Sequence, residues 1–342
     1  MPPRVSVVID NYNYGRFLGQ CIQSALDQDY PRDLLEIIVV DDGSTDDSRA
    51  VAEGFGTRLR LILQENSGQA GAFSAGLAAA RGEIVCLMDS DDYWRPEKVR
   101  TVAAAFDEAQ IGVVQHPLLD VDEQGRALPT NLPEWPARYA LADYLGGRVA
   151  LAAASGLALR RNVLRDILPI PLDIAYASDA YLIAHGLLSC QAANLGQVLG
   201  CHRIHGRNNW AGYARSAEKL ETGLRLREAF HRHLDPKLQA RGLAYGRFFL
   251  QCEAADIKRE RLLIAMHRRR RGEAFRLWKE LWQERPASSF NIFKCLTLLP
   301  AFISPDLYLA LNRCYARNTR LRRLRELLCA GAGRRNDDAQ AP

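Results

Sequence analysis

The fold of this chain is indicated most clearly by the stretch Ile84-Val85-Cys86-Leu87-Met88-Asp89-Ser90-Asp91-Asp92. Its apolar first half is typical of a short, fully buried strand, and three carboxylates follow at the carboxyl end. In open α/β sheets, that end of the strands is where ligands bind. An Asp-x-Asp turn offers hard oxygen ligands to Mg2+ or Mn2+, which keep positions free for diphosphate oxygens. Acidic turns are also commonly just solvated, so this stretch alone leaves a metal role open.

A second strand in the sequence repeats the pattern. Residues 36–40 are apolar after Glu36 and lead into Asp41-Asp42-Gly43-Ser44-Thr45-Asp46, so two strands deliver carboxylates to one sheet edge. Between the two acidic stretches lies the glycine-rich segment 66–76, where Gly68 lets the backbone approach a ligand and the next helix can face an anion. A tight turn with close helix packing would explain the same glycines.

Strand and helix patterns alternate through the first hundred residues. We expect strands at 5–9, 36–40, 59–64 and 84–88, and helices at 17–26, 48–55 and 70–80. This alternation predicts an α/β fold with a mainly parallel, Rossmann-like sheet flanked by helices. A helix at 96–110, a strand at 111–118 and a loop-rich stretch at 119–145 follow.

From about residue 213 onward only helical patterns remain. They cover residues 218–233, 243–266, 272–284 and 307–328. We therefore expect a catalytic domain at 1–212, a helical and basic domain at 213–330, and a disordered tail at 331–342.

The composition indicates an ordinary globular protein. The chain has 342 residues, of which 48% are hydrophobic and 25% charged, and this length allows two domains. The eight cysteines contain no Cys-x-x-Cys pair, which favours reduced thiols in the cytoplasm. Because the first expected strand begins almost at Met1, we expect no signal peptide. We expect a cytoplasmic location.

Charge is distributed unevenly between the two halves. Residues 1–214 carry 18 Lys/Arg against 26 Asp/Glu, a net charge of −8, whereas residues 215–342 carry 27 against 14, a net charge of +13. The basic half predicts peripheral contact with the anionic inner face of the cytoplasmic membrane. Residues 293–314 are apolar but interrupted by Lys294, Pro300, Pro305 and Asp306, so we expect an interfacial hairpin or ordinary core helices and no spanning helix.

Five stretches, taken together, resemble the family 2 inverting glycosyltransferases of the A-type nucleotide-sugar-binding fold. They are residues 5–9, Asn11-Tyr12-Asn13, residues 39–46, Asn66-Ser67-Gly68 and residues 89–92. Ordered motifs from separate strands are specific, although each one alone would be weak. The resemblance covers residues 4 to 212, and the helical region beyond lies outside it.

The resemblance implies a donor-binding role for several residues. Tyr12 would stack on the nucleobase and Asp42 would accept a hydrogen bond from its edge. Asp10, which stands where the family usually has proline, borders the same pocket. Asp91 would be a direct metal ligand, with Asp89 nearby on the ribose or metal side.

The resemblance also implies a base and a second group of ligands. Asp179, in Tyr176-Ala177-Ser178-Asp179-Ala180, would be the general base, although an aspartate there could equally be a plain helix cap. Arg203 and His205, in the stretch 201–208, would complete the metal or diphosphate site, with a surface histidine as the alternative for His205. Ser155 and Gly156 would line the donor sugar and the acceptor.

The expected function is transfer of a sugar, with inversion, from a nucleotide-diphosphate donor. The donor would be a UDP-sugar, the cofactor Mg2+ or Mn2+, and the acceptor a glycan or a lipid-linked acceptor in cell-surface or exopolysaccharide synthesis. One alternative is a sugar nucleotidyltransferase, which needs a Gly-rich, Lys/Arg-bearing loop after the first strand, unlike residues 10–15. Another is a non-catalytic protein that binds nucleotide-sugar or nucleic acid. The intact set of metal and base candidates disfavours it, and we expect no nucleic-acid partner.

Overall fold

The computed structural model describes residues 2–283 and 298–311, except 131, 133–134, 148, 207, 209–215, 305–306 and 309–310. The chain divides into two compact units, Met1–Asn209 with Glu228–Gly246, and Trp210–Arg227 with Arg247–Pro342. The domain boundary expected at 212 stays a prediction, and the tail expected at 331–342 lies outside the described residues.

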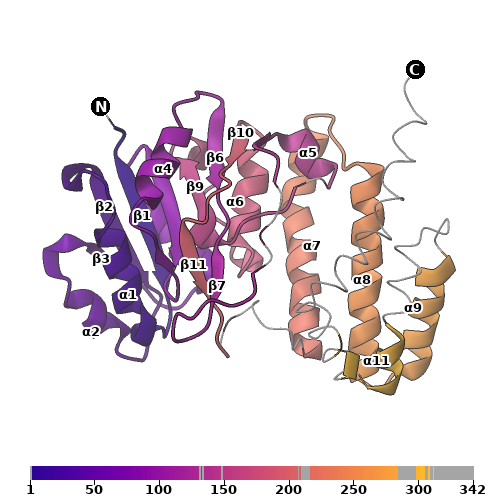
Figure 1. The fold of residues 1–342 in the computed structure, drawn as a ribbon. Coiled ribbons are helices and arrows are strands. Elements are labelled where there is room, and N and C mark those ends of the chain that lie inside the picture. Colours follow the sequence, from indigo (N-terminus) through magenta and orange to yellow (C-terminus); the bar gives the residue numbers. More distant parts are fainter. Residues whose placement is uncertain are drawn as a thin grey trace. The chain divides into compact units, whose positions relative to one another are not determined.

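An eight-stranded sheet forms the centre of the first unit (Figure 1). Its order is β3-β2-β1-β4-β9-β6-β10-β8, and the strands are parallel except β9 and β8. The mainly parallel sheet expected from the alternating pattern is confirmed. The strands are β1 Val5–Asn11, β2 Leu35–Asp41, β3 Arg60–Leu63, β4 Ile84–Asp89, β6 Ile111–Gln115, β8 Arg138–Tyr139, β9 Leu157–Arg160 and β10 Gln191–Asn194.

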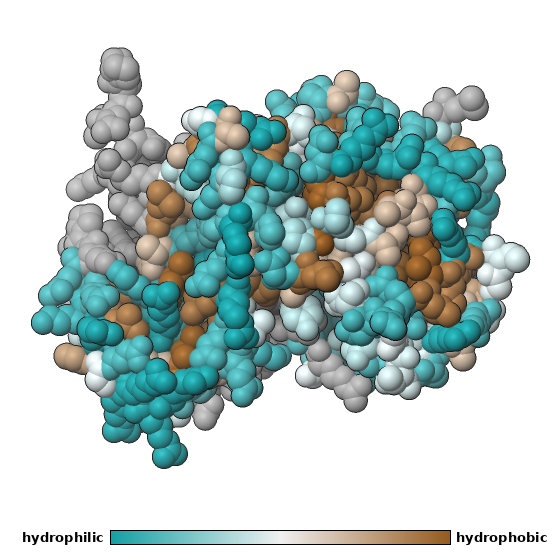
Figure 2. Space-filling view, turned by 180° about the vertical axis from the view of Figure 1, so that it is seen from behind, coloured by the Kyte–Doolittle hydropathy of each residue, from teal (hydrophilic) through white to brown (hydrophobic). Residues whose placement is uncertain are grey.

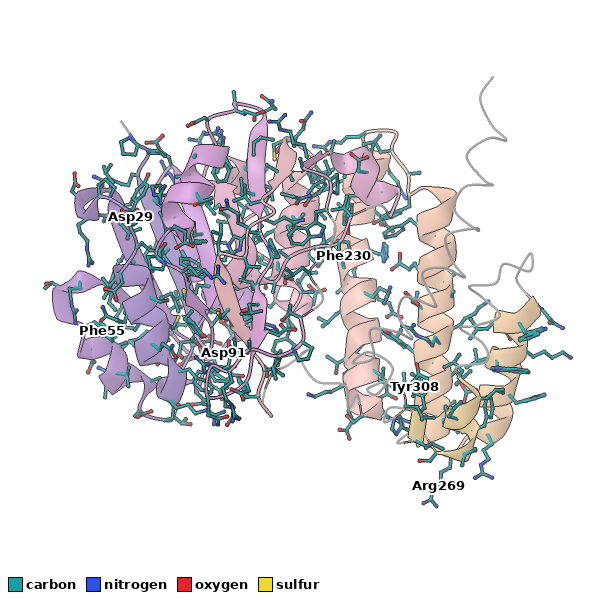
Figure 3. All side chains as sticks on the ribbon, in the orientation of Figure 1. Asp29, Phe55, Asp91, Phe230, Arg269 and Tyr308 are labelled. Carbon is teal, nitrogen blue, oxygen red and sulfur yellow. The ribbon has the colours of Figure 1, made fainter. Side chains whose placement is uncertain are left out.

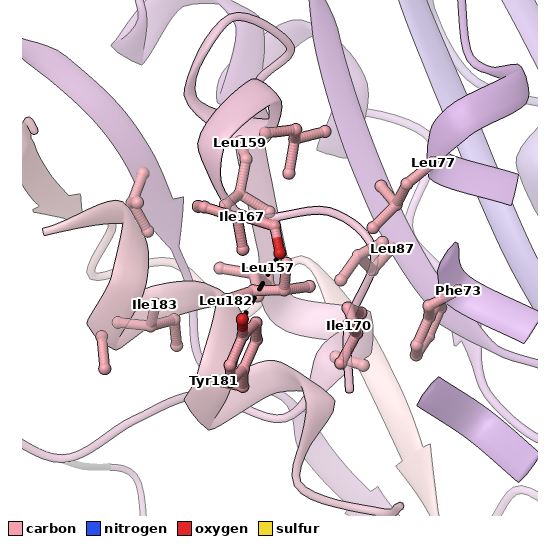
Figure 4. Packing of buried hydrophobic residues seen from close by; sticks show 14 of the residues in the cluster. Phe73, Leu77, Leu87, Leu157, Leu159, Ile167, Ile170, Tyr181, Leu182 and Ile183 are labelled. Atoms are coloured by element: carbon pink, nitrogen blue, oxygen red, sulfur yellow. Dashed lines mark hydrogen bonds between the residues drawn. The ribbon is translucent and has the colours of Figure 1, made fainter. Parts of the chain in front are cut away.

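Helices flank this sheet because successive side chains of its buried strands point to opposite faces. On β1, Val7 and Ile9 pack in one hydrophobic cluster with Leu18 of α1, whereas Val8 packs in another with Phe73 of α3. Figure 4 shows part of the second cluster, including the hydrogen bond from the Tyr181 hydroxyl to the carbonyl oxygen of Ile167. The helices are α1 Gly15–Leu26, α2 Ser48–Glu53, α3 Gly68–Ala79, α4 Lys98–Ala105, α5 Leu141–Leu145 and α6 Ser178–Gly186.

A second, three-stranded sheet was not anticipated from the sequence. It has the order β5-β11-β7 and consists of β5 Tyr93–Trp94, β11 Gly200–Arg203 and β7 Leu119–Val121. These strands have two to four residues, too few for a periodic pattern to be recognised. Two expected elements are also shorter than predicted, since α4 ends at Ala105 and β6 at Gln115.

The second unit is helical in its described part. Its helices are α8 Arg247–His267, α9 Arg271–Gln283 and α11 Leu299–Ile303, and α7 Ala217–Gln239 contributes its residues up to 227. A separate core that includes Leu262, Ala274 and Leu281 holds these helices together. Most of the helix expected at 307–328 lies outside the described residues.

Membrane-crossing segments are absent from the part of the chain that the structure describes. No helix there combines the length and the apolar character needed to traverse a bilayer. Hydrophilic residues cover most of the face seen in Figure 2, with hydrophobic patches between them.

Candidate active site

Carboxylates gather where β1 and β4 end. The two strands pair in parallel with Asp10 opposite Asp89, so their side chains share one edge of the sheet. Burial raises the pKa of Asp10 to about 8 and, with the negative charge of Asp10, raises that of Asp89 well above its usual range. The Oδ1 atom of Asp10 is buried without a hydrogen-bond partner among the described residues. The nearby protein groups therefore do not offset the cost of charging both of these carboxyl groups.

Asp91 follows this edge and meets two polar side chains from the segment after β11. Its Oδ2 atom lies 2.9 Å from Nε2 of His205 and accepts a hydrogen bond of 3.2 Å from Nδ2 of Asn208. Asp91 lies at the lower edge of the sheet in Figure 3. Asn208 in turn accepts a 2.5 Å hydrogen bond from the backbone N–H of His205. The structure thus brings together the two residues expected to bind metal, and it adds Asn208, which ends the same stretch 201–208 but was given no role from the sequence.

Two aromatic rings hold the imidazole of His205 in place. The ring centroids of Tyr14 and Phe17, just before and within α1, lie 5.3 and 5.2 Å from that of His205. Burial and the charge of Asp91 raise the pKa of the Tyr14 hydroxyl, which keeps it neutral. His205 is therefore oriented by packing, as a metal ligand would need to be. It is buried, so the surface-histidine alternative does not apply.

Arg203 is buried and supports the acidic turn, residues 89–92, through hydrogen bonds. Its guanidinium donates to the carbonyl oxygens of Asp91 and Glu123 and to Oε1 of Gln20, at 2.9, 2.7 and 2.7 Å. It also lies 4.6 Å from the centroid of the Phe17 ring. Its expected contact with the donor stays a prediction, because these three hydrogen bonds use three of the five guanidinium N–H groups.

Asp92 and His202 complete the electrostatics of this edge. Asp92 accepts a 2.8 Å hydrogen bond from the backbone N–H of Arg203, and burial raises its pKa to about 7. Burial alone would lower the pKa of His202, but its hydrogen bond with Asp120 and the charge of Asp92 raise it to about 9. His202 is therefore a cation at neutral pH beside the acidic turn.

Asp179 lies in the first turn of α6. Its Oδ1 atom accepts a 2.7 Å hydrogen bond from the backbone N–H of Ala180. Burial raises its pKa to about 6, which outweighs the lowering effect of the backbone hydrogen bonds. The charge of Asp179 also contributes to the raised pKa of Asp89, so both carboxylates belong to one electrostatic site. The role of Asp179 as general base stays a prediction.

Asp42 anchors the start of α3. Its Oδ1 accepts hydrogen bonds from Nε2 of Gln64 and from the backbone N–H of Ser67, and its Oδ2 accepts one of 2.8 Å from the N–H of Gly68. The carboxylate thus occupies the anion-binding end of this helix. The sequence did not indicate this structural role, and the expected contact of Asp42 with a nucleobase stays a prediction.

The remaining expected donor residues differ in accessibility. The side chain of Tyr12 is 46% exposed, which leaves it accessible for stacking. Ser155 is fully buried, and its Oγ accepts a 3.0 Å hydrogen bond from the N–H of Asp89. Gly156 has no room for a side chain, because a Cβ atom there would lie 2.5 Å from the carbonyl oxygen of His116. Ser155 therefore supports the acidic turn, and the lining of a sugar by Ser155 and Gly156 stays a prediction.

The side chains at this edge suit a hard divalent cation. In the described residues, no group of three His, Cys, Asp or Glu side chains is already arranged as a metal cluster. However, Asp91 and His205 offer an oxygen and a nitrogen in contact, and the unpartnered oxygen of Asp10 lies at the same edge. Carboxylate oxygens with one imidazole fit Mn2+ or Mg2+.

Comparisons with known proteins agree with this architecture. The family described as Glycosyl transferase family 2 matches residues 6–168. An uncharacterized glycosyltransferase, alr2836 of Nostoc sp., is 35% identical over 227 residues, which cover 64% of this chain and 70% of that protein. The poly(ribitol-phosphate) beta-N-acetylglucosaminyltransferase TarS of Staphylococcus aureus is 33% identical over 133 residues, 38% of this chain and 23% of TarS.

Solved structures show the same fold. The mannosyltransferase PcManGT from Pyrobaculum calidifontis, in complex with GDP-Man and Mn2+, has a TM-score of 0.56 at 17% identity and is matched over 96% of this chain and 84% of that one. S. aureus TarS 1-349 in complex with UDP-GlcNAc has a TM-score of 0.53 at 18% identity, over 92% and 91%. Because the family's sequence pattern is matched and the identity with alr2836 extends over most of that protein, the chain belongs to glycosyl transferase family 2, with the A-type fold.

Proposed function

We propose that the chain transfers a sugar from a UDP-sugar to a hydroxyl of a glycan or lipid-linked acceptor, with inversion, in the synthesis of a surface or exopolysaccharide. One observation mainly supports the proposal. Several carboxyl groups that are removed from water lie together at the sheet edge, next to the contact between Asp91 and His205.

Relatives and solved structures support the donor and the acceptor class. TarS is named a poly(ribitol-phosphate) beta-N-acetylglucosaminyltransferase, and its solved complexes contain UDP and UDP-GlcNAc. A protein of Escherichia coli named chondroitin synthase is 32% identical over 138 residues, 39% of this chain and 20% of that protein. The UDP-sugar and the polymeric acceptor are carried over from these partial matches.

Asp91 and His205 would hold a divalent ion, Mg2+ or Mn2+. Such an ion, when bound, neutralises negative charge on a diphosphate leaving group. The protein residues have their own tasks: Tyr14 and Phe17 orient His205, and Asn208 orients Asp91. Tyr12 would stack on the base, and the donor pocket would be formed or supported by Asp10, Asp42, Gly68, Asp89, Ser155, Gly156 and Arg203.

Asp179 would act as the general base. The acceptor hydroxyl oxygen forms a bond to the anomeric carbon while the bond from that carbon to the diphosphate oxygen breaks. The hydroxyl proton passes to the Asp179 carboxylate, and the nucleoside diphosphate leaves. A single displacement inverts the anomeric configuration, so an α-linked donor gives a β-glycoside.

The proposal includes a peripheral contact of the basic C-terminal region with the inner face of the cytoplasmic membrane. Its support is the net charge of +13 over residues 215–342. No nucleic-acid partner is proposed.

A thermal-shift panel tests the donor. UDP, UDP-GlcNAc, UDP-glucose, GDP and GDP-mannose would each be added with Mn2+ or with EDTA, because a ligand that binds the folded state raises the Tm. We expect the UDP compounds to raise the Tm only with Mn2+. Stabilisation by GDP-mannose alone would refute the UDP-sugar, and no stabilisation by any donor would refute the donor site.

A further inference from the structure

Helix α9 arranges its side chains by chemical type around its axis. At about 100° per residue, its buried residues occupy one sector, its aromatic residues the next, its cations the third and its acids the last. The sectors are, in that order, Ala274, Leu277 and Leu281; Phe275, Trp278 and Trp282; Arg276 and Lys279; and Glu273 and Glu280. The helix thus has a stripe of aromatic side chains beside the stripe of buried side chains that packs into the core of the second unit.

The aromatic stripe is continuous and faces solvent. Phe275 and Trp282 are 57% and 45% exposed, and the Trp278 ring centroid lies 6.0 and 5.6 Å from theirs. Side chains of this size strongly favour removal from water. A row of them at the surface indicates a docking surface.

Helix α11 extends this apolar surface. The ring of Phe302 lies 6.3 Å from that of Trp278, so the two helices meet at the stripe. Leu299 and Ile303 are four residues apart on α11 and therefore share one side of it, and they are 43% and 76% exposed. Aromatic and aliphatic side chains thus form one exposed apolar area.

Cations border this area, and the acids of α9 lie away from it. Arg276 and Lys279 follow the aromatic sector around the helix, and Arg269 and Arg271 lie in the turn before α9 and at its first residue. Arg269, labelled in Figure 3, lies in the turn between α8 and α9. The acids are engaged by other cations, Glu280 with Lys258 and Glu273 with Arg270.

We infer that this α9–α11 face, formed by Phe275, Trp282, Leu299, Ile303 and the bordering cations, docks on an anionic lipid bilayer. Trp and Phe favour the bilayer interface, aliphatic side chains enter the acyl boundary, and cations pair with lipid phosphates. Nucleic acid would use the cations and rings but not the exposed aliphatic residues. The inference rests on the proposed function, and it names the surface through which the C-terminal region would contact the membrane.

Vesicle co-sedimentation of the full chain tests the inference. The lipids would be phosphatidylcholine alone or mixed with phosphatidylglycerol, at low and high salt. The wild type should pellet with the mixed vesicles only, and less at high salt. The double variant Phe275→Ser/Trp282→Ser should bind at least about tenfold more weakly. The matched control is Leu63→Ser, an exposed apolar residue of the first unit, which should bind as wild type does.

Two further variants separate apolar insertion from charge. Arg276→Gln/Lys279→Gln should reduce the salt dependence, because it removes two of the bordering cations. Ile303→Ser, on α11, should weaken binding while leaving α9 unchanged. Quenching of tryptophan fluorescence by brominated lipid should be largely lost in Trp282→Phe, which keeps the apolar surface. Unchanged Tm values would show that all variants fold.

Three outcomes would overturn the inference. They are equal pelleting of wild type and the Phe275→Ser/Trp282→Ser variant, equal pelleting on neutral and mixed vesicles, and self-association without lipid that the same variant abolishes. The last would make the face an interface between copies of the chain. The UDP thermal shift is read separately, so failure of the donor site would leave the vesicle result interpretable.

Discussion

At the scale of single residues, the contact between Asp91 and His205 is the most specific feature of the candidate site. Carboxylate and imidazole come from segments 114 residues apart, and packing by Tyr14 and Phe17 orients the imidazole. Asn208 donates a further hydrogen bond to Asp91. Such support around a ligand commonly changes metal affinity by about 10- to 100-fold.

Asp91→Asn should weaken binding of UDP in the presence of Mn2+ by at least about tenfold, because it removes one charged ligand and keeps the shape. Isothermal titration calorimetry would measure the affinity. Asp33→Asn, at an exposed position, is the matched control and should leave affinity unchanged. Equal affinities for wild type and Asp91→Asn would exclude Asp91 as a metal ligand.

Asp179→Asn should reduce the rate of sugar transfer roughly a hundredfold or more while UDP affinity stays near wild type. The reason is that a general base acts on the acceptor and not on the nucleotide. Product formation from the donor identified by thermal shift, measured with UDP affinity on the same preparation, separates these effects. A variant that transfers at nearly the wild-type rate would move the base to another carboxylate.

The pH dependence of the rate should report Asp179. Its pKa of about 6 means that the carboxylate form, which accepts the proton, increases as pH rises through this value. We expect kcat to rise between pH 5 and 7, by about tenfold per pH unit at the acidic end. Asp179→Glu, which keeps a carboxylate, should retain a rising profile, and Asp179→Asn should lose it. A wild-type profile that is flat over this range would contradict the assignment.

At the scale of elements, the short 3-10 helix η3, Ala154–Gly156, supports the acidic turn through hydrogen bonds. Ser155 accepts hydrogen bonds through Oγ from the N–H of Asp89 and through its carbonyl oxygen from Nε1 of Trp94. The ring centroid of Trp94 in turn lies 3.3 Å from Nζ of the buried Lys98. The three-stranded sheet, which contains Trp94, thereby connects to the acidic turn.

Gly156→Ala should destabilise the first unit by about 1–3 kcal/mol, since its Cβ would lie 2.5 Å from the carbonyl oxygen of His116 and the backbone would have to move. Differential scanning fluorimetry would detect a lower Tm. Gly196→Ala is the matched control, because a Cβ there meets nothing within 4 Å. Equal Tm values for the two variants would mean that the close approach at Gly156 is relaxed in solution.

At the scale of the whole molecule, buried titrating groups should make the stability of the metal-free protein fall as pH rises above 7.5. The pKa values of Asp10 and His202 are about 8 and 9, above the ordinary values of 3.8 and 6.5. The folded state therefore binds more protons than the unfolded state up to these values, so the free energy of unfolding decreases as pH rises. The buried His116 and His185, with pKa values of about 3 and 4, take up protons on unfolding mainly below about pH 7 and oppose the trend only there.

We expect the Tm in EDTA to fall by a few degrees between pH 7.5 and 8.5, and Asp10→Asn to reduce this fall. Mg2+ should oppose the decrease, because it binds the deprotonated carboxylates of the folded state. Thermal melts at several pH values, with EDTA or Mg2+, provide the measurement. A Tm that rises with pH in EDTA would show that the carboxylates are not buried as described.

Local sequence patterns were sufficient to predict the alternating fold and the sheet edge at which the candidate site lies. Apolar runs at 5–9, 36–40 and 84–88 have the length of buried strands, and the acidic residues after them must meet where parallel strands end. Each pattern lies within a few neighbouring residues, which is why Asp89, Asp91 and Asp42 stand out from the sequence alone. The basic C-terminal half was equally evident from composition.

Which of those residues are accessible and which are engaged depends on the tertiary structure. The contacts that decide this join segments from 25 to more than a hundred residues apart. They are the contact of His205 with Asp91, the hydrogen bonds of Asp42 with the start of α3, and the hydrogen bond of Arg203 with the backbone of Asp91. The two-residue strand β5 likewise forms because β11 pairs with it. No local pattern encodes such pairs, since they depend on chain crossovers and on packing of side chains from distant elements.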